Sequence, residues 1–583
     1  MNPDLAQRLR HALRVVTAEL LAELGPRGHW TGELSSSALA TATAITALAA
    51  ADGTAHAGLI RPGLEWLARH VNRDGGWGDT TRSRSNVSTT ALVWAAFGTA
   101  RADAEFASLV EGAANYLERN AGPSDRLVHA IESLYGRDRT FSVPITMTLA
   151  LSGRLGPNGW RRVRPLPFEL AALPRGLFAA LGLPVVSYAL PALIAIGQVI
   201  HHHAPRLHPL RRLARRRTLD RLTQLQPPNG GFLEATPLTS FVTMSLAAMG
   251  LSAHPVARRG VAFIRSSARS DGSWPIDSNL ATWVTTLAIK ALRHQPGILS
   301  APQRDGLRAW LLAQQHQLLH PYTGAAPGGW AWTDLPGGVP DADDTAGALL
   351  ALRDLDEPDP ETLRAGAAGV QWLLDLQNRD GGMPTFCRGW GRLPFDRSTP
   401  EITAHVARAW RIWLPDLPLK LVKPTRAAMA RAFRFISTSQ RQDGAWIPLW
   451  FGNEHAPRDE NAIYGAAQVL LGLDEDASLT RPRAMGRRFL RQQQNSDDGW
   501  GGALSAPSTV EETALAMEAL AGDPSAANHL ERGTQWLIRT LETAHPIEPA
   551  PIGLYFARLW YAERLYPLVF AASALGRLNS KNR

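Results

Sequence analysis

A short pattern that recurs along the chain constrains its fold more than any other feature. Each copy is an amphipathic stretch that ends near Gln and is followed by Asp or Asn, Gly and a bulky residue. The copies begin at Gly63 (GLEWLARHVNRDGGWG), Asp220 (DRLTQLQPPNGGF), Gly260 (GVAFIRSSARSDGSW), Gly369 (GVQWLLDLQNRDGGM), Ala432 (AFRFISTSQRQDGAW) and Arg487 (RRFLRQQQNSDDGWGG). The pattern predicts a helix stopped by Gly, with the bulky side chain folded over the turn and Gln bonded to exposed backbone groups.

Stretches rich in small residues lie between the copies, at 88–96, 279–292, 345–352 and 511–521. Helix, turn and helix thus alternate without strand signals, which predicts an all-α fold, a closed array of helix pairs. The copies are irregularly spaced, at roughly 40–160 residues, so a simple solenoid is not expected. We interpret the turn residues Trp77, Trp274 and Trp500 as structural.

The composition is that of a folded chain with many indole rings. Hydrophobic residues make up 45% of the 583 residues and charged ones 19%, which excludes a disordered protein. Trp numbers 19, against 16 Phe and 8 Tyr, and Trp has the best π face for holding a cation. The single cysteine, Cys387, excludes an internal disulfide and a Cys-cluster zinc site.

Much of the net charge of +9 lies in residues 201–221, where seven arginines stand against one acid. The arginines are Arg206, Arg211, Arg212, Arg215, Arg216, Arg217 and Arg221. No aromatic residues interleave with them, so we expect no nucleic-acid partner. The run His201 to His203 has no Cys or acidic partners and is expected at a membrane interface rather than on a metal.

The segment before this patch, residues 176–200, has no charged residue (GLFAALGLPVVSYALPALIAIGQVI). It is long enough to span a bilayer, but Pro184 and Pro191 would interrupt a straight helix. A broken apolar segment beside an arginine cluster favours a protein that dips into one leaflet and binds anionic headgroups. The alternative is an internal apolar helix with a solvated arginine face.

Three carboxylates lie within four residues, at Asp341, Asp343 and Asp344, after the Trp-rich stretch GGWAW at 328–332. Like charges this close cannot all ionise readily, so at least one proton is retained near neutral pH. A neutral carboxylic acid with apolar neighbours can protonate a hydrocarbon. Taken alone, however, the Asp run is better explained as a helix N-cap.

Together, the DADDTA sequence, the repeated turns and the apolar segment resemble the squalene-hopene cyclases, the bacterial triterpene branch of the class II terpene cyclases. The resemblance extends over most of the chain, from about residue 30 to residue 577. In that family two α/α barrels, called β and γ, enclose an apolar cavity, and a channel opens into one membrane leaflet. The resemblance implies an N-terminal segment at 1–24 that packs on the catalytic barrel, a γ-type barrel at 25–280 with a membrane-attachment segment at 176–217, and a β-type catalytic barrel at 281–583.

Carried over by position, the resemblance makes Asp343 the proton donor, supported by Asp341 and Asp344. His405 matches the histidine that hydrogen-bonds the donor. Glu401 stands where the family has an Asp beside that histidine, and it is expected to hold His405 in place.

Aromatic side chains are expected to line the cavity and to face cationic intermediates. By position they are Trp332, Phe386, Trp446, Trp450, Tyr555, Trp560 and Tyr561. The stretches 35–43 and 86–92 contain no acid, whereas family members carry acids there that help order the water which ends the reaction. The first chemical step is therefore better supported than the product.

The expected function is that of a class II terpene cyclase. It would protonate a terminal alkene of squalene, or of a squalene-like linear polyprenoid, and cyclise it to a polycyclic, hopene-like triterpene, ending by proton loss or, as in a hydro-lyase, with water. We expect no cofactor and no metal. The implied partners are the isoprenoid substrate, anionic membrane lipid and a second copy of the chain, with monotopic attachment to the cytoplasmic side of the cell membrane.

Three alternatives remain open. A class II diterpene cyclase acting on geranylgeranyl diphosphate would need cationic or Mg²⁺-binding groups for the diphosphate. A non-catalytic lipid-binding protein could use the same helical framework. A zinc-dependent prenyltransferase β-subunit would need an Asp/Cys/His metal site, for which Cys387 lacks the local context.

Overall fold

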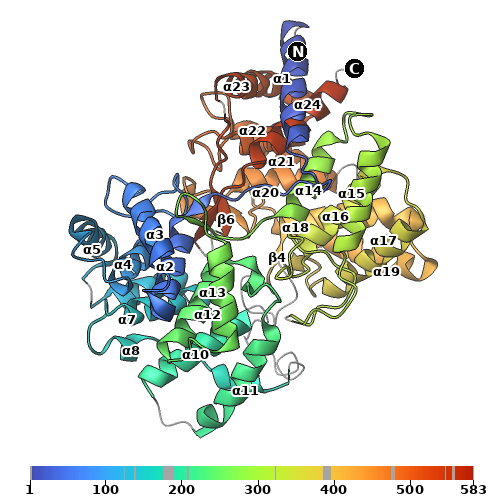
Figure 1. Cartoon of the computed structure of the whole chain (residues 1–583). Helices are drawn as coiled ribbons and strands as arrows, with labels where there is room; N and C mark the ends of the chain where they lie inside the picture. Colours follow the sequence, from blue (N-terminus) through green and yellow to red (C-terminus); the bar gives the residue numbers. More distant parts are fainter. Residues whose placement is uncertain are drawn as a thin grey trace.

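The computed structural model describes residues 3–123, 125–136, 139–174, 189–205, 209–321, 323–384, 396–473, 479–544, 546–554 and 558–581. Helices dominate these residues and form two rings, drawn in blue to green and in yellow-green to red in Figure 1. The first helix, α1 (Pro3–Ala22), is the exception to this division, because it lies on the second ring. The fold is all-α, as the repeats predict, and it has the two α/α barrels that the family resemblance implies.

The first ring is the γ-type barrel. Its inner helices contact one another in sequence, and the last of them returns to the first. They are α2 (Ala38–Asp52), α4 (Val87–Thr99), α7 (Arg139–Leu151), α10 (Leu190–His203) and α12 (Thr236–Ala248). Around them lie α3 (Ala57–Arg69), α5 (Ala107–Ala121), α6 (Leu127–Tyr135), α8 (Gly159–Arg162), η1 (Phe168–Ala172), α11 (Pro209–Leu225), η3 (Phe232–Glu234) and α13 (Pro255–Ser266).

The second ring is the β-type barrel, whose inner ring closes where α24 contacts α14. Its inner helices are α14 (Ala281–Leu292), α16 (Ala342–Leu355), α18 (Pro400–Trp413), α20 (Ala462–Gly472), α22 (Val510–Leu520) and α24 (Tyr566–Lys581). Its outer helices are α15 (Ala301–Gln314), α17 (Pro360–Leu376), α19 (Leu419–Ser439), α21 (Thr480–Gln492) and α23 (Ala527–Thr543), with the short η5 (Leu414–Asp416), η6 (Pro457–Asp459) and η8 (Pro524–Ala526) beside them. Helix α1 contacts α23 and α24 and so adds to this outer layer.

Each repeat ties its outer helix to the next one. The indole N–H of Trp30, Trp77, Trp274, Trp330, Trp446 and Trp500 donates to a carbonyl near the end of the preceding helix, at 2.7–2.9 Å. The amide of Gln226, Gln315, Gln377, Gln440 and Gln494 donates to a carbonyl of its own turn and to one on the following outer helix. The indoles thus satisfy carbonyls that a helix end leaves free, and the glutamines join each turn to the following outer helix.

Each repeat also fixes the start of an inner helix. The backbone N–H of the bulky turn residue donates to a threonine hydroxyl on that helix, at 2.9–3.0 Å. The pairs are Trp77–Thr90, Phe232–Thr239, Trp274–Thr41, Trp330–Thr345, Met383–Thr403 and Trp500–Thr513. The turns therefore position the N-terminal residues of the inner helices.

Strands are short in the described residues and serve mainly to join turns to helix starts. They are β1 (Ser36–Ser37), β2 (Trp274–Pro275), β3 (Met383–Pro384), β4 (Ser398–Thr399), β5 (Phe451–Gly452), β6 (Ile552–Leu554) and β7 (Leu559–Tyr561). β1 pairs with β2, β3 pairs with β4, and β5, β6 and β7 form one antiparallel sheet.

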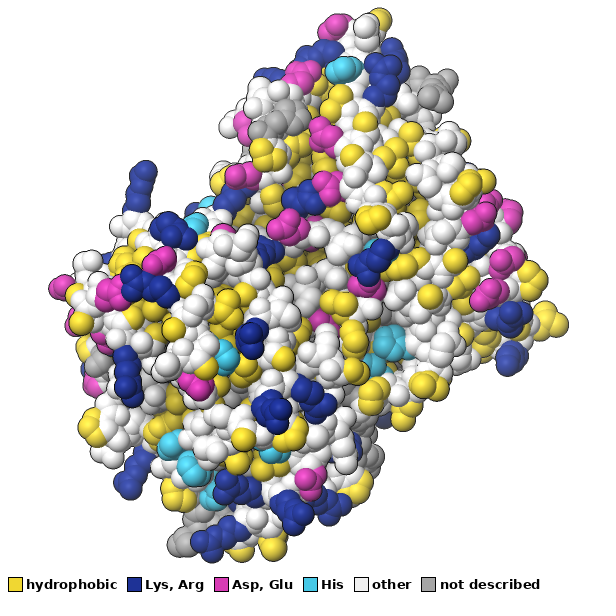
Figure 2. Space-filling view, viewed as in Figure 1, with side chains coloured by type: hydrophobic (Ala, Val, Ile, Leu, Met, Phe, Trp, Pro, Cys, Tyr) yellow, Lys and Arg dark blue, Asp and Glu magenta, His cyan; other side chains and the backbone are white. Residues whose placement is uncertain are grey.

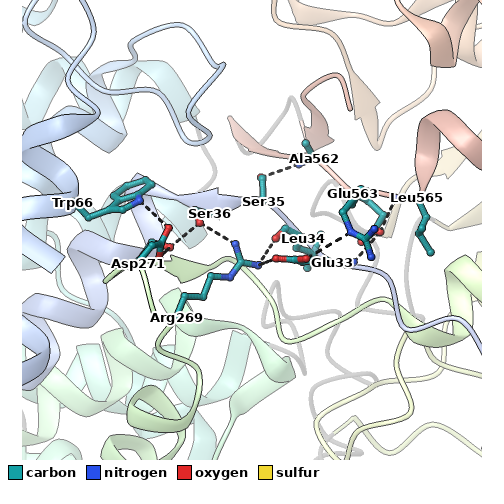
Figure 3. A network of polar contacts seen from close by, with 12 residues as sticks. Glu33, Leu34, Ser35, Ser36, Trp66, Arg269, Asp271, Ala562, Glu563 and Leu565 are labelled. Carbon is teal, nitrogen blue, oxygen red and sulfur yellow. Dashed lines mark hydrogen bonds and ion pairs between the residues drawn. The ribbon is translucent and has the colours of Figure 1, made fainter. Parts of the chain in front are cut away.

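The chain between α1 and α2 links the two barrels (Figure 3). On the γ side, Arg269 donates to Ser36 Oγ at 2.8 Å and forms an ion pair with Glu33 at 3.7 Å. On the β side, Glu563 accepts the backbone N–H groups of Glu33 and Leu565, both at 3.0 Å. Burial raises the pKa of Glu563 to about 7. This network holds the barrels against each other around the space between them.

The last part of the apolar segment forms helix α10, which belongs to the protein core. Leu190, Ile194 and Val199 are buried in the hydrophobic cluster of the γ-type barrel. Pro191 stands in the first turn of α10, where a missing N–H is harmless, so it begins a helix rather than interrupting one. The expectation that this segment faces lipid is wrong for residues 189–200, and Pro184 lies outside the described residues.

The arginine patch on α11 has an inner and an outer face. Arg211 is buried, with Nε 3.1 Å from Glu169 Oε2 and its guanidinium over the Phe168 ring, so it is an internal ion pair rather than a ligand for a headgroup. The outer face exposes Arg212, Arg215, Arg216 and Arg217, together with Leu210 and Leu213. Basic side chains gather at the lower end of Figure 2, where Figure 1 places α11. Within the described residues, no helix has the length and apolar character needed to cross a membrane.

Candidate active site

The acidic cluster lies at the start of α16, where a repeat turn holds it. Asp341 is the N-cap of this helix, and its Oδ1 accepts the backbone N–H groups of Asp343 and Asp344, both at 2.9 Å. Its own N–H donates to the carbonyl of Trp330 at 3.0 Å. The N-cap interpretation and the acid interpretation of the Asp run are thus compatible, because the cap is Asp341 and the side chain of Asp343 remains available.

Asp343 pairs with a histidine from the neighbouring inner helix. His405 Nδ1 lies 2.6 Å from Asp343 Oδ1. The two side chains are 22% and 19% exposed, whereas Asp341 and Asp344 are 3% and 5% exposed. Asp343 is therefore the accessible acid of the cluster, and the structure brings it together with His405 as the sequence predicts.

Burial keeps protons on the two inner acids of the cluster. Burial raises the pKa of Asp341 to about 7, and it raises the pKa of Asp344 well above its ordinary value. The two carboxyl groups hydrogen-bond to each other, so their titrations are coupled. Asp343 thus stands beside a largely neutral pair near pH 7, which limits the negative charge around it.

Glu401 does not hold His405. Among the described residues, its hydrogen bonds come from the Thr399 hydroxyl and from the backbone N–H of Leu449, the latter at 3.3 Å. The Glu401 carboxyl therefore points toward Thr399 of β4 and toward Leu449, although Glu401 and His405 lie one helical turn apart. Burial raises the pKa of Glu401 to about 8, so it supports the loop at 449 mainly as a neutral acid.

A cavity of about 340 Å³ lies between the barrels and reaches Asp341, Asp343 and Asp344. Its wall combines γ-type residues such as Leu39, Leu92 and Phe241 with β-type residues such as Trp283 and Ile402. Most of the wall is aliphatic or aromatic, and none of the described residues that line it is Lys, Arg or His. The space is suited to an apolar ligand that meets a carboxylic acid at one point.

Three of the predicted aromatic residues line this cavity, namely Trp332, Trp450 and Tyr561. Trp446 does not line it, because Trp446 is fully buried in a repeat turn, where its indole donates to the Ile436 carbonyl. Phe386 and Tyr555 lie outside the described residues.

Trp560 points away from the cavity because side chains alternate along β7. Leu559 and Tyr561 line the cavity, and the residue between them must face the other way. The backbone N–H of Trp560 donates to Asp79 Oδ2 of the γ-type barrel at 2.8 Å. Trp560 therefore helps to join the barrels.

Two residues of the wall that bear on its chemistry, Trp283 and Asp277, were not predicted from the sequence. Trp283 lines the cavity, with its ring edge-on to His405 at 6.4 Å between centroids, and its indole donates to Tyr566. A Trp within the small-residue stretch at 279–292 was the available signal. Asp277 also lines the cavity, but in the sequence it resembles any loop acid.

Within the part of the chain that the structure describes, no group of three His, Cys, Asp or Glu side chains is arranged to hold a metal ion. The cluster on α16 is held by hydrogen bonds to backbone groups and between carboxyls, as described above. Independently of this, a carboxylic acid paired with a histidine at the wall of an apolar cavity can carry out proton transfer.

Comparison with known proteins places these features in a family. Residues 13–183 match the squalene-hopene cyclase N-terminal domain, and residues 279–580 match the squalene-hopene cyclase C-terminal domain. The ent-copalyl diphosphate synthase from Streptomyces platensis has a similar fold, with a TM-score of 0.59 and 19% identity, over 99% of this chain and 100% of that one.

Two characterised relatives align with large parts of the chain. A terpene cyclase-glycosyl transferase fusion protein from Humicola fuscoatra is 29% identical over 63% of this chain and 31% of its own length. The squalene-hopene cyclase from Alicyclobacillus acidocaldarius is 27% identical over 66% of this chain and 64% of its own length. The chain thus aligns with less than two thirds of either relative. With both domains of the family matched, the chain belongs to the squalene-hopene cyclase family of class II terpene cyclases.

Proposed function

We propose that the protein protonates a terminal alkene of squalene, or of a squalene-like linear polyprenoid, and cyclises it to a polycyclic triterpene. The observation that carries this proposal is the Asp343–His405 pair, which opens onto the apolar cavity between the barrels. Asp343 is the proton donor in this scheme, and His405 is the residue that positions it and stabilises its conjugate base.

The first step moves one proton from the Asp343 carboxyl to the terminal carbon of the alkene. The electron pair of that double bond forms the new C–H bond, and the cation left on the adjacent carbon is attacked by the next double bond. A protonated His405 donates through Nδ1 to Asp343 Oδ1 and stabilises the carboxylate that remains. The neutral Asp341–Asp344 pair keeps further negative charge away from that carboxylate.

The cavity wall supplies the remaining stabilisation. Trp283, Trp332, Trp450 and Tyr561 present aromatic rings to the cavity, and each face near a desolvated cation is worth about 0.5–2 kcal/mol. A chain held folded by the apolar wall has its double bonds close to the geometry of attack. Exclusion of water protects the cation until the cascade is complete.

A hydrocarbon substrate suits this wall better than an isoprenoid diphosphate. Proteins bind diphosphates through Arg, Lys or bound Mg²⁺, and the described residues of the wall include no cationic side chain. The deciding experiment is to incubate purified protein with squalene or with geranylgeranyl diphosphate, each with and without Mg²⁺, and to identify products by mass spectrometry. Conversion of squalene without Mg²⁺ supports the proposal, and conversion of the diphosphate alone would replace it with diterpene cyclisation.

We also propose that the outer face of α11 docks on an anionic lipid surface on the cytoplasmic side of the membrane. Its exposed arginines flank Leu210 and Leu213, which are 60% and 77% exposed. Each basic residue near such a surface contributes about 1 kcal/mol, and the two leucines can enter the headgroup region.

Binding to vesicles that contain phosphatidylserine tests this docking face. Replacing Arg212, Arg215, Arg216 and Arg217 by Ser should weaken binding strongly, and added salt should weaken it in the unaltered protein. The control replaces Arg481 and Arg488 on α21, which are exposed on the other barrel. Equal binding by both variants would contradict the assignment.

A further inference from the structure

The cavity contains a second acid that the proposed first step does not use. Asp277 lies on the segment that leads from the γ-type barrel into α14, and its side chain lines the same cavity as Asp343. Among the described residues of the wall, it is the one carboxyl outside the acidic cluster of α16. Burial, aided by the nearby Glu234, raises the pKa of Asp277 well above its ordinary value.

The position of Asp277 is fixed by an acid behind it. Glu234 Oε1 accepts from Asn229 Nδ2 and from the backbone N–H of Gly337, both at 2.7 Å, and its Oε2 accepts from the Ser278 hydroxyl at 3.0 Å. The Ser278 backbone N–H also donates to the Glu234 carbonyl at 3.1 Å.

The turn that carries Glu234 is itself strained. Leu233 and Glu234 both have positive φ, 56° and 55°, a conformation that non-glycine residues adopt mainly where the surrounding structure enforces it. The turn directs Leu233 into the cavity and Glu234 behind Asp277. The segment at Asp277 is thus held from two sides.

Asp277 also lies beside a ring that can stabilise a cation. The indole N–H of Trp332 and the backbone N–H of Asn279 lie beside the Asp277 carboxyl. The hydroxyl groups of the two wall tyrosines already have hydrogen-bond partners, because the Tyr135 hydroxyl pairs with Ser88 and the Tyr561 hydroxyl pairs with Tyr566. A water molecule in a largely apolar cavity needs polar partners, and the Asp277 carboxyl offers them next to Trp332.

We propose that Asp277 is the residue that positions the water molecule which ends the reaction, at the cation that forms beside Trp332. This inference rests on the proposed cyclisation. A neutral carboxyl serves the purpose better than a carboxylate, because an anion there would itself combine with the cation. Asp343 then begins and Asp277 ends the reaction in one apolar cavity.

The terminating step balances the first one. The water oxygen forms a C–O bond with the cationic carbon, which gives an oxonium ion. The oxonium ion loses one proton to a carboxyl oxygen of Asp277, and the other carboxyl oxygen releases its own proton to bulk water when the product leaves, so Asp277 ends as it began. Bulk water returns one proton to the Asp343 carboxylate, and the net change is addition of water to the cyclised polyprenoid.

The test follows the origin of oxygen in the product. Squalene is converted in H₂¹⁸O by the unaltered protein and by the variants Asp277→Leu and Asp277→Asn. We expect a labelled alcohol from the unaltered protein, at least a tenfold smaller share of alcohol with more alkene from Asp277→Leu, and most of the alcohol from Asp277→Asn, whose amide still binds water. An unchanged product ratio in Asp277→Leu, or unlabelled products from the unaltered protein, would overturn the proposal.

The control variant is Asp334→Asn. Asp334 is a neighbouring acid that accepts from Asn279 at 3.4 Å and does not line the cavity. It should leave the product ratio unchanged, so a shift there as large as in Asp277→Leu would show that any disturbance of this segment redirects the reaction and would reject a specific role for Asp277.

Ligand binding separates this inference from the proposed function. The hydroxyl of farnesol stands in for the water, and farnesene is the matched hydrocarbon. With binding followed by tryptophan fluorescence, Asp277→Leu should weaken farnesol binding roughly tenfold through the lost hydrogen bond and change farnesene binding less than twofold. If no protein converts squalene, the proposed function fails, and this comparison still decides whether Asp277 holds a polar group; equal losses for both ligands would refute it.

Discussion

Helices α16 and α22 of the β-type barrel begin in the same way but carry different chemistry. Thr345 and Thr513 accept the backbone N–H of Trp330 and Trp500, at 3.0 and 2.9 Å. Four residues before these threonines, each helix has an N-cap side chain, and two residues before them each has a buried or partly buried acid, Asp343 on α16 and Glu511 on α22.

The surroundings of the two acids differ. Asp343 faces the cavity and pairs with His405, whereas Glu511 is 5% exposed and accepts the backbone N–H of Ala550 at 2.8 Å. Burial raises the pKa of Glu511 to about 8, so a neutral acid alone does not define the site. The repeat turn fixes where the acid lies on the helix. The residues packed over the start of the helix decide whether that acid can reach a substrate.

The largest effect should come from removing the proton of Asp343. Asp343→Asn keeps the shape of the side chain but cannot donate a proton to an alkene, so turnover should fall by about 10³-fold or more. Glu511→Gln should retain most of the activity, because its side-chain oxygen can still accept from Ala550. Turnover of squalene per folded molecule, with circular dichroism to verify folding, is the measurement.

This pair of variants can break the comparison in two ways. Activity near normal in folded Asp343→Asn would remove Asp343 as the donor. Equal loss in Glu511→Gln would mean that acids at this position act through the fold rather than through the cavity.

The second-largest effect should come from replacing His405, the histidine that pairs with Asp343. His405→Phe removes the hydrogen bond to Asp343 Oδ1, and a bond to a charged group is worth about 1.5–3 kcal/mol, so kcat should fall roughly 10- to 150-fold. A structural histidine would behave differently, with a lower melting temperature and a normal kcat per folded molecule. Measuring both quantities on the same preparation decides between these roles.

The repeats explain why much of the fold could be predicted from sequence. Each turn stops its helix through the residues of the repeat itself, so the helical character follows from local chemistry, although the same Gln and Trp side chains also bond to neighbouring helices. The acidic cluster and His405 could be paired only through the family resemblance, because Asp343 and His405 are 62 residues apart.

The parts that could not be predicted depend on long-range packing. The family resemblance assigned Trp560 to the cavity by position, and the alternation of β7 turns it away. The resemblance also assigned Glu401 to His405, but the Glu401 carboxyl accepts from Leu449. Hydropathy does not distinguish a lipid-facing segment from a core helix, so α10 was placed wrongly.

A smaller effect should appear in the pH dependence. Burial raises the pKa of Asp341 to about 7 and that of Asp344 well above its ordinary value, so above about pH 7 the neutral pair loses the first of its two protons. The new negative charge opposes formation of the Asp343 carboxylate. We expect kcat to fall with rising pH, by up to about tenfold per unit for one proton. Asp341→Asn keeps the cap and should flatten this decline, whereas Glu511→Gln should leave it unchanged. A flat profile of kcat between pH 6 and about 9 in the unaltered protein would contradict the view that proton loss from the Asp341–Asp344 pair slows the reaction.

Stability should follow the same acid. Because its pKa is raised in the folded state, Asp341 favours folding most below the unfolded value of about 3.9, and this contribution is lost as pH rises through about 7. The melting temperature of Asp341→Asn should therefore depend less on pH over this window than that of the unaltered protein.

The smallest effect tests the shared framework itself. Thr345→Val and Thr513→Val each remove the hydroxyl that accepts the N–H of Trp330 or Trp500, and leaving a buried N–H unpaired costs about 1–3 kcal/mol. Both variants should lose stability by similar amounts in urea unfolding. Only Thr345→Val should also lower kcat, by a few-fold, because Thr345 is two residues from Asp343 and the shift moves the acid away from His405. Equal activity in the two variants would mean that the repeat turn at Trp330 supports the helix without setting the position of the acid.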